Sequence, residues 1–250
     1  VRRIVGELRK LALTPSRSSV RRVLVDEGLL PDPDRRAPKG VTTPWRTFVS
    51  MHVNTMVACD FFCKKVWTPM GKRVAYGLMF IHLGSRKVFV SPGTYHPTED
   101  WVKQQARNVS MWLDDEGINP THLIRDRDTK FTASFDQVFE TAGTEIIETP
   151  CQAPIANCYA ESWIGSMKRE CLNHFACFGL RHFNHIVQTY ANYYNHVRPH
   201  QGKDNQPLTM SNDPIPIHAA KSPPGPEKIG VVQRHTWLGG LLSHYERKAA

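Results

Sequence analysis

Three acidic residues lie where a carboxylate is either costly to bury or well placed for chemistry. Asp60 lies within the apolar segment "VACDFF", and the first lysine after it is Lys64. Asp126 ends the segment "THLIRD", and Glu161 lies near the start of "NCYAESWIGSMKREC" (157–171). Burying a carboxylate is unfavourable unless a cation or hydrogen bonds compensate for the lost water. Asp60 and Asp126 are each as consistent with a structural role as with a site. Glu161 is either an acid placed for the helix dipole or a partner of the other two.

The elements that carry these acids alternate between strands and helices. Apolar and β-branched residues at 55–62 predict a buried strand with Asp60 near its end, and 121–126 predicts a short strand ending on Asp126. Strands are also expected at 72–83, 86–93 and 144–150, and helices at 97–117, 134–143 and 157–171. The expected order is therefore β-β-β-α-β-α-β-α, a mixed α/β core.

Local patterns indicate where the helices start and which sides they bury. Ser134 with Gln137 predicts a capping box, and Asn157 is expected to cap the helix that carries Glu161 and so to orient that acid indirectly. Two helical faces are expected in the core, formed by Val102, Ala106, Val109 and Leu113 and by Phe183, Ile186, Val187, Tyr190 and Tyr194. The second face is interpreted as core rather than as a platform for stacking bases.

The charge of the chain is concentrated at its ends. With 250 residues, 40% of them hydrophobic, the composition predicts a globular protein with one sizeable core. The net charge is +9: residues 1–40 hold 10 Lys/Arg and 5 Asp/Glu, 221–250 hold 5 and 2, and 41–220 hold 17 and 16. Basic ends favour a polyanionic partner such as nucleic acid, although solvated surface charge explains them equally well.

Cysteine spacing and hydropathy indicate the compartment. The six cysteines contain no CxxC pair, so free buried thiols in a reducing cytoplasm are expected rather than disulfides or a metal site. The apolar run at 74–83 is too short to span a bilayer and contains a histidine. No signal-peptide pattern opens the chain, so no membrane partner is expected.

Two proline-rich stretches, 31–44 and 212–228, read as linkers. Before the first, residues 1–30 suggest two short helices, the second capped by Ser16 or Ser18 and ended by Gly28. This pair is interpreted as a helix-turn-helix-like DNA-binding segment whose second helix presents Arg21 and Arg22, although any small basic helical pair would look similar. Residues 209–250 form a proline-rich linker and a basic tail, either a small β unit or a DNA-touching arm.

Four segments together resemble a known family. "ACDFF", "LIRDRDTKF" and "PIANCYAESWIGSMKRE" are similar to the three signatures of DDE-type transposases and of the retroviral-integrase catalytic core. "YNHVRPHQG" (194–202) resembles a stretch common in bacterial insertion-sequence transposases. The 34 residues between Asp126 and Glu161 also fall in the family's narrow range. The resemblance covers 45–208, roughly two-thirds of the chain.

The resemblance implies a ribonuclease H-like fold, a five-stranded mixed sheet flanked by helices. In that fold the first and fourth strands are adjacent, which brings Asp60 and Asp126 together, and Glu161 is the family's catalytic glutamate. The implied activity is metal-dependent cleavage and transfer of DNA strands. Two Mg²⁺ (or Mn²⁺) ions, held by all three acids and bridged by Asp60, would serve the attacking and leaving oxygens. The implied partners are double-stranded DNA and a second copy of the chain, as a homodimer or higher oligomer on DNA in the bacterial cytoplasm at the nucleoid.

The chain departs from the family's pattern after Asp126, where Arg127-Asp128 replaces the usual Asn-Gly or Arg-Gly. Asp128 is thus a rival ligand, although Phe131 fits the family's spacing from Asp126. The zinc domain that precedes the retroviral core is absent, so no zinc is expected.

DNA contacts are predicted for Lys168, Arg169 and Arg198, and considered for His196 and His200, with exposed helix ends as the alternative. Two other functions fit the same acids. One is a ribonuclease H-like nuclease that cleaves without joining, which has no need of the basic flanks. The other is a catalytically silent DNA-binding protein derived from a transposable element.

Overall fold

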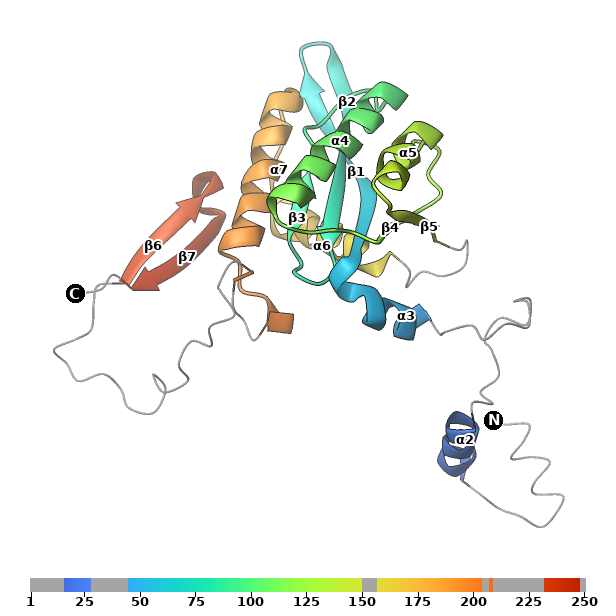
Figure 1. Cartoon of the computed structure of the whole chain (residues 1–250). Coiled ribbons are helices and arrows are strands. Elements are labelled where there is room, and N and C mark those ends of the chain that lie inside the picture. The colour runs from blue at the N-terminus through green and yellow to red at the C-terminus, as the bar shows by residue number, and fades with distance from the viewer. Residues whose placement is uncertain (1–15, 28–44, 150–156, 204–206, 209–231, 248–250) are drawn as a thin grey trace, which may run out of the picture. The chain divides into compact units, whose positions relative to one another are not determined.

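The computed structural model describes residues 16–27, 45–149, 157–203, 207–208 and 232–247 (Figure 1). The chain divides into two compact units, residues 1–44 and 45–250, which are described separately. No helix in these described ranges is both long and apolar enough to cross a membrane.

In the first unit the structure describes one helix, α2 (Arg17–Asp26). The Ser16 hydroxyl accepts a hydrogen bond from the backbone N–H of Ser19, so the prediction of a serine-capped helix here is confirmed. The first expected helix, Gly28 and both linkers lie outside the described residues. The helix-turn-helix interpretation therefore stays a prediction.

The second unit is built on a five-stranded sheet with the order β3-β2-β1-β4-β5. The strands are β1 (Met56–Thr68), β2 (Gly71–His82), β3 (Val88–Val90), β4 (His122–Arg125) and β5 (Glu145–Glu148). β1 and β2 pair antiparallel, as do β2 and β3, whereas β4 is parallel to both β1 and β5. This mixed sheet confirms the expected fold class and the adjacency of the first and fourth strands.

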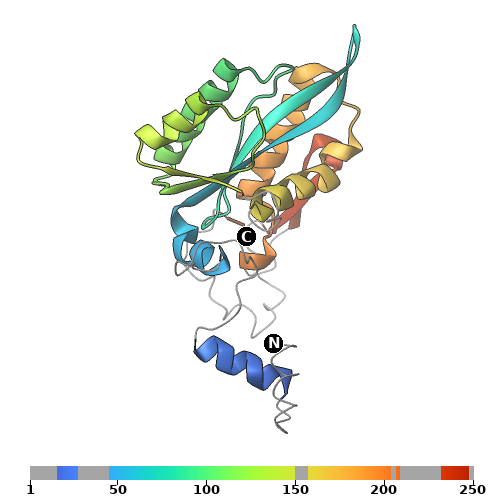
Figure 2. The same ribbon diagram turned by 90° about the vertical axis from the view of Figure 1, so that its right-hand side faces the viewer.

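β1 is longer than the predicted strand 55–62, and Asp60 is its fifth residue rather than near its end. Beyond Phe62, buried Val66 alternates with exposed Cys63, Lys65 and Trp67. That alternation is the pattern of a strand with one covered face, and it continues through the lysines that suggested an end. The long β1–β2 hairpin therefore projects beyond the helices (Figures 1 and 2).

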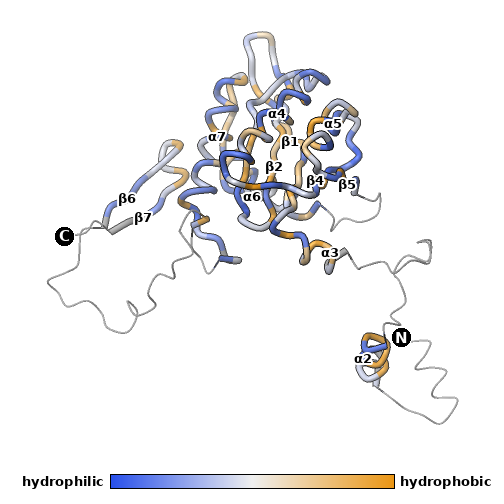
Figure 3. The backbone as a smooth tube through the Cα atoms, in the orientation of Figure 1, coloured by the Kyte–Doolittle hydropathy of each residue, from blue (hydrophilic) through white to orange (hydrophobic). Residues whose placement is uncertain are grey.

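Helices cover both faces of the sheet (Figure 2). α4 (Glu99–Asp115) and α5 (Ala133–Thr141) lie on one face, and α6 (Cys158–Glu170) and α7 (Gly179–His196) on the other. Hydrophobic stretches of β1 and β2 run between these layers (Figure 3). All residues of the two predicted helical core faces are buried, so both predictions are confirmed. The remaining helices are α3 (Trp45–His52) and the short 3₁₀ turns Val53–Thr55, Leu172–His174, Gln201–Lys203 and Leu238–Gly240.

Two local predictions are resolved by the structure. α5 begins at Ala133 after Thr132, and no side chain caps it; the Ser134 hydroxyl instead lies 2.9 Å from the Thr132 hydroxyl. The predicted capping box of Ser134 with Gln137 is therefore wrong. The cysteines described by the structure are free, as predicted, although Cys63 is exposed rather than buried.

The C-terminal tail forms a β-hairpin, β6 (Val232–Trp237) and β7 (Leu242–Arg247). Leu242 is buried, and the Trp237 ring lies 5.6 Å from the Tyr193 ring of α7. The small β unit expected as one alternative is thus formed, and it packs on the core.

Candidate active site

Asp60 and Asp126 lie side by side because of the parallel register of β1 and β4. Val57 is opposite Leu123 and Ala58 is opposite Ile124, so the same register carried two residues further places Asp60 beside Asp126. Asp126 follows the last residue of β4, at the carboxyl end of that strand.

The pKa of Asp60 depends on its burial and on the acids around it. The pKa of Asp60 is raised to about 7, first by burial and then by the nearby charges of Asp126, Glu161 and Asp128, against a hydrogen bond from the Phe61 N–H that lowers it. Within the described ranges no ion pair joins Asp60 to a cation, and the charges that raise its pKa are those of other acids. The site therefore carries unbalanced negative charge once Asp60 loses its proton.

Glu161 reaches this neighbourhood from the first turn of α6, where its side chain is exposed and its N–H donates to the Asn157 carbonyl oxygen at 3.1 Å. Asn157 is the N-cap residue of this helix, as predicted, but its side chain makes no capping hydrogen bond. Its Nδ2 instead donates to the carbonyl oxygen of Cys59 at 3.1 Å. Asn157 therefore ties the start of the Glu161 helix directly to the strand residue before Asp60.

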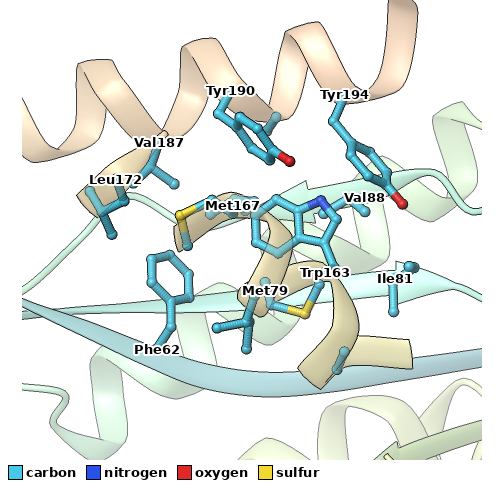
Figure 4. Close-up of a cluster of buried hydrophobic side chains, with 14 of the residues drawn as sticks. Phe62, Met79, Ile81, Val88, Trp163, Met167, Leu172, Val187, Tyr190 and Tyr194 are labelled. Carbon is cyan, nitrogen blue, oxygen red and sulfur yellow. The ribbon is translucent and has the colours of Figure 1, made fainter. Parts of the chain in front are cut away.

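Packing behind the acids fixes α6 against the sheet. Trp163, two residues after Glu161, is 2% exposed, and its ring lies 5.9 Å from that of Tyr190 and 6.0 Å from that of Tyr194 (Figure 4). Phe62, two residues after Asp60, completes the cluster at 6.4 Å from Trp163. The backbone positions of Glu161 and Asp60 are thereby fixed through neighbours in one hydrophobic core.

The Phe62 ring needs the glycine that faces it across the hairpin. Gly77 pairs with Phe62, and a Cβ on Gly77 would lie 2.4 Å from the Phe62 ring. Phe62 is only 3% exposed, so its ring has no free space into which it could move. The absence of a side chain at Gly77 is therefore a requirement of the packing next to Asp60.

Asp128, the rival ligand, is already paired. Its carboxylate accepts from the Lys130 ammonium at 2.7 Å and from the Lys130 N–H at 3.0 Å. Burial raises the pKa of Asp128, but these bonds from Lys130 outweigh it and lower the pKa. The Asp126 carboxylate accepts a hydrogen bond from the N–H of Asp128, at 3.1 Å, and makes no ion pair with any residue that the structure describes. The uncompensated carboxylate is that of Asp126.

Arg125 lies beside Asp126 in sequence, but its guanidinium pairs with other carboxylates. Arg125 is 6% exposed, and its guanidinium donates to Asp136 at 2.9 and 2.7 Å, to Glu148 at 2.8 Å and to the backbone carbonyl oxygen of Asp126 at 3.0 Å. This buried pairing was not predicted, because Asp136 and Glu148 lie on other elements, α5 and β5, at no regular spacing from Arg125.

The donor set suits a hard divalent cation, although the acids do not converge on one point. Carboxylate oxygens are the ligands that Mg²⁺ prefers, and the raised pKa of Asp60 shows charge that a cation would offset. Within the described ranges, however, no three His, Cys, Asp or Glu side chains are grouped so that they could hold a metal ion. The exposed carboxylate of Glu161 is the member free to turn.

The predicted DNA-contact residues occupy different environments. Lys168 is half-buried and makes no hydrogen bond or ion pair within the described part of the chain, whereas exposed Arg169 lies 3.4 Å from the Ser166 hydroxyl. Arg22 is exposed on α2 and Arg21 lies on the same helix, with its side chain outside the described atoms.

Arg198 and His200 are not solvated residues at a helix end. Arg198 bonds both carboxylate oxygens of Glu170, at 2.9 and 2.5 Å, and the Tyr190 hydroxyl donates to the same carboxylate at 2.9 Å. His200 is 7% exposed, with Nε2 2.9 Å from the carbonyl oxygen of Tyr194. His200 is therefore buried, and a DNA contact by it stays a hypothesis. The guanidinium of Arg198 is committed to closing the end of α7 onto α6.

Comparison with known proteins relates the chain to DNA integrases. Residues 142–207 match a family described as integrase core domain, and no curated protein matches the sequence. Among solved structures, a chain of the simian T-cell lymphotropic virus intasome, in complex with the PP2A regulatory subunit B56 gamma, has a TM-score of 0.52 at 13% identity, over 87% of this chain and 73% of that chain. This likeness shows the fold.

Two further structures are more distant. The HTLV-2 integrase catalytic core domain in complex with magnesium has a TM-score of 0.46 at 14% identity, over 61% of this chain and 93% of that chain. The BIV integrase catalytic core domain has a TM-score of 0.44 at 14% identity, over 62% and 91%. The segment that matches the integrase core family contains β5, α6 and α7 and leaves β1 to β4 outside it.

Proposed function

We propose that this protein cuts and joins DNA strands by phosphodiester transfer, with Asp60, Asp126 and Glu161 as its catalytic carboxylates. The observation that carries the proposal is the parallel register of β1 and β4, which sets Asp60 beside Asp126 at the carboxyl end of β4, with Glu161 of α6 among the charges that act on Asp60. The integrase core match over 142–207 supports the same reaction class.

The three acids would hold two Mg²⁺ or Mn²⁺ ions, with Asp60 shared between them. Such ions activate the attacking water or DNA 3′-hydroxyl and offset the charge on the departing oxygen. Asp60 must be ionised to serve as a ligand, and its pKa of about 7 therefore makes metal affinity fall as the pH drops below neutrality.

Neighbouring residues support this arrangement without being ligands. Lys130 pairs with Asp128, and Asp136 with Glu148 pair with Arg125. Lys168 lies seven residues after Glu161, on nearly the same side of α6, where its ammonium would meet a DNA phosphate. Arg169 and the α2 arginines Arg21 and Arg22 would add phosphate contacts.

Joining two DNA ends to one target requires two active sites, and each chain supplies one set of acids. The working form is therefore at least a dimer, assembled on double-stranded DNA at the bacterial nucleoid. The mass of the protein–DNA complex in solution, measured by light scattering, tests this: an active complex containing a single chain would contradict it.

The experiment for the reaction itself uses supercoiled plasmid as target and a labelled DNA duplex as donor, with Mg²⁺ or Mn²⁺. Wild-type protein should nick the plasmid and join the labelled strand to it. Asp60→Asn, Asp126→Asn and Glu161→Gln should each lose both products by at least about a thousandfold, because each removes metal-binding charge while keeping its shape. Asp128→Asn is the matched control and should stay active.

Each alternative function has its own outcome in this assay. Nicking without joining by the wild type would favour a nuclease. DNA binding without either product would favour a silent DNA-binding protein. If Asp128→Asn were inactive and Asp126→Asn active, the second catalytic acid would be Asp128 rather than Asp126.

A further inference from the structure

The nearly neutral region 41–220 contains segments that carry no acid and a segment rich in acids. Residues 61–98 contain six Lys/Arg and no Asp/Glu, and residues 171–203 contain three and none. Residues 99–170, between them, contain seven Lys/Arg and thirteen Asp/Glu. The first acid-free segment contains the outer part of the β1–β2 hairpin, and the second contains α7 and the turn before it.

These two acid-free segments meet at the outer end of β1. The backbone N–H of Trp67 donates to the Cys177 carbonyl oxygen at 2.8 Å, and Trp67 forms a parallel bridge with Phe178. On its other side Trp67 pairs with Lys72 of β2. Residues paired across neighbouring strands point to the same face of a sheet. Phe178, Trp67 and Lys72 therefore form one continuous cross-strand row, called here the Trp67 row.

The Trp67 row is open to solvent and already stacked. Phe178 is 65% exposed and Trp67 is 48% exposed, which is unusual for two adjacent large aromatic side chains. The His182 ring stacks on Phe178 with centroids 5.9 Å apart at an interplanar angle of 5°, and the Lys72 ammonium lies 4.2 Å from the Trp67 ring centroid. Flat rings are thus fixed in place beside a cation.

Further cations surround the row. Lys65 lies two residues before Trp67 on the same face of β1, and its side chain is exposed. Arg181, in the first turn of α7 after Phe178, is also exposed. Neither side chain makes a hydrogen bond or ion pair within the described part of the chain. Their charges are therefore available to a ligand.

We propose that the Trp67 row, with Lys65 and Arg181, is a DNA-binding surface on which unpaired bases stack while the cations contact phosphates. Exposed aromatic rings among cations suit a nucleic acid strand, because every base has a flat face and every link carries a charge. This rests on the proposed function and deepens it by placing a DNA contact away from the acids. Seven positions of extended strand, about 23 Å, lead from Asp60 to Trp67, and this odd spacing places the two side chains on opposite faces of the sheet.

A second copy of this chain fits the surface poorly. A symmetric contact would bring the same patch from each subunit together, and this patch contains cations but no acid. An acidic protein would also neutralise these cations, and the binding test below distinguishes such a partner from DNA.

The test measures binding of a fluorescein-labelled DNA duplex with a single-stranded 3′ tail by fluorescence anisotropy, in EDTA, with full-length protein and varied salt. Lys65→Glu/Lys72→Glu should weaken binding at least about tenfold and make the salt slope shallower by about two, because two phosphate contacts are lost. Lys103→Glu/Arg107→Glu on α4 is the matched control, since it changes the net charge equally, and its affinity should fall less than about threefold.

A second variant isolates stacking from charge. Trp67→Leu/Phe178→Leu should weaken binding to the tailed duplex about tenfold, leave the salt slope unchanged, and affect a blunt duplex less. Equal losses in the charge variant and its α4 control, or no loss in either surface variant, would overturn the proposal; the second result would leave an acidic protein as the partner. EDTA excludes metal-dependent cleavage, so failure here is distinct from failure of Asp60→Asn to abolish the reaction.

Discussion

The two halves of β1 carry opposite charges, the first in a largely buried environment and the second in an exposed one. In the first half, residues 57–60 pair with β2, and residues 56–58 pair with β4 on the other side. Among residues 56–60, only Asp60 is not fully buried. Residues 63–68 pair with β2 and, through Trp67, bridge to Phe178. The first half carries an acid held among other acids, and the second carries lysines and an exposed tryptophan.

This difference separates two kinds of functional signal. A half-buried carboxylate surrounded by acids costs folding free energy, so its position indicates chemistry that uses the charge. An exposed aromatic row among cations leaves apolar surface in water, so its position indicates a ligand that covers it. On one strand, the first signal predicts where DNA reacts and the second where DNA is held.

The largest expected contrast is between a buried and an exposed tryptophan. Trp163→Ala should lower the free energy of unfolding by about 3–5 kcal/mol, because it empties the space between α6, α7 and Phe62. Trp67→Ala should lower it by only about 1 kcal/mol, since the ring is 48% exposed. Urea unfolding of both variants measures the difference. Similar losses would mean that the Trp67 row is structural.

A second contrast compares a buried cation with an exposed one. Arg125→Met should destabilise the protein by about 3 kcal/mol, because it leaves Asp136 and Glu148 without their partner. Lys65→Met should cost less than about 0.5 kcal/mol. Adding Asp136→Asn to Arg125→Met should recover part of the loss. No recovery in urea unfolding would show that Arg125 acts through packing rather than charge.

The smallest expected effect concerns Arg198. Its ion pair with Glu170 is partly exposed, so Arg198→Ala should cost about 1 kcal/mol of unfolding free energy. DNA affinity should change less than about twofold, because this guanidinium is committed to Glu170 rather than to phosphate. Lys168→Ala, tested beside it, should weaken DNA binding without a matching loss of stability. The opposite ranking in an anisotropy titration would restore Arg198 as a DNA contact.

Much of the fold could be predicted because burial leaves a periodic pattern. The helical face of α4 and the alternation of strands and helices follow directly from hydrophobic spacing. The full length of β1 was missed because Lys64 and Lys65 resemble a strand end, although Val66 continues the buried side. The Asn157 bond to Cys59 and the Arg198 pair with Glu170 depend on contacts across 98 and 28 residues, which no local pattern encodes.

The candidate site was predicted from the spacing of three acids, but its electrostatics needed the sheet register. Asp60 and Asp126 become neighbours only because β4 pairs with β1 in parallel. Spacing alone left Asp128 as a rival to Asp126, and the Lys130 pair that neutralises Asp128 favours Asp126 as the second ligand.

The central claim is that Asp60, Asp126 and Glu161 form one negatively charged site that binds divalent metal, and the Mg²⁺-induced change in unfolding temperature at about pH 8 tests it most directly. Because folding raises the pKa of Asp60 to about 7, its ionised form destabilises the metal-free protein, and this penalty grows as the pH rises toward and through 7. Asp60→Asn should therefore unfold a few degrees above the metal-free wild type at about pH 8, and no higher than it at about pH 4. Mg²⁺ should raise the unfolding temperature of the wild type and of Asp128→Asn but leave that of Asp60→Asn unchanged. An equal Mg²⁺-induced rise in Asp60→Asn and the wild type would contradict the claim.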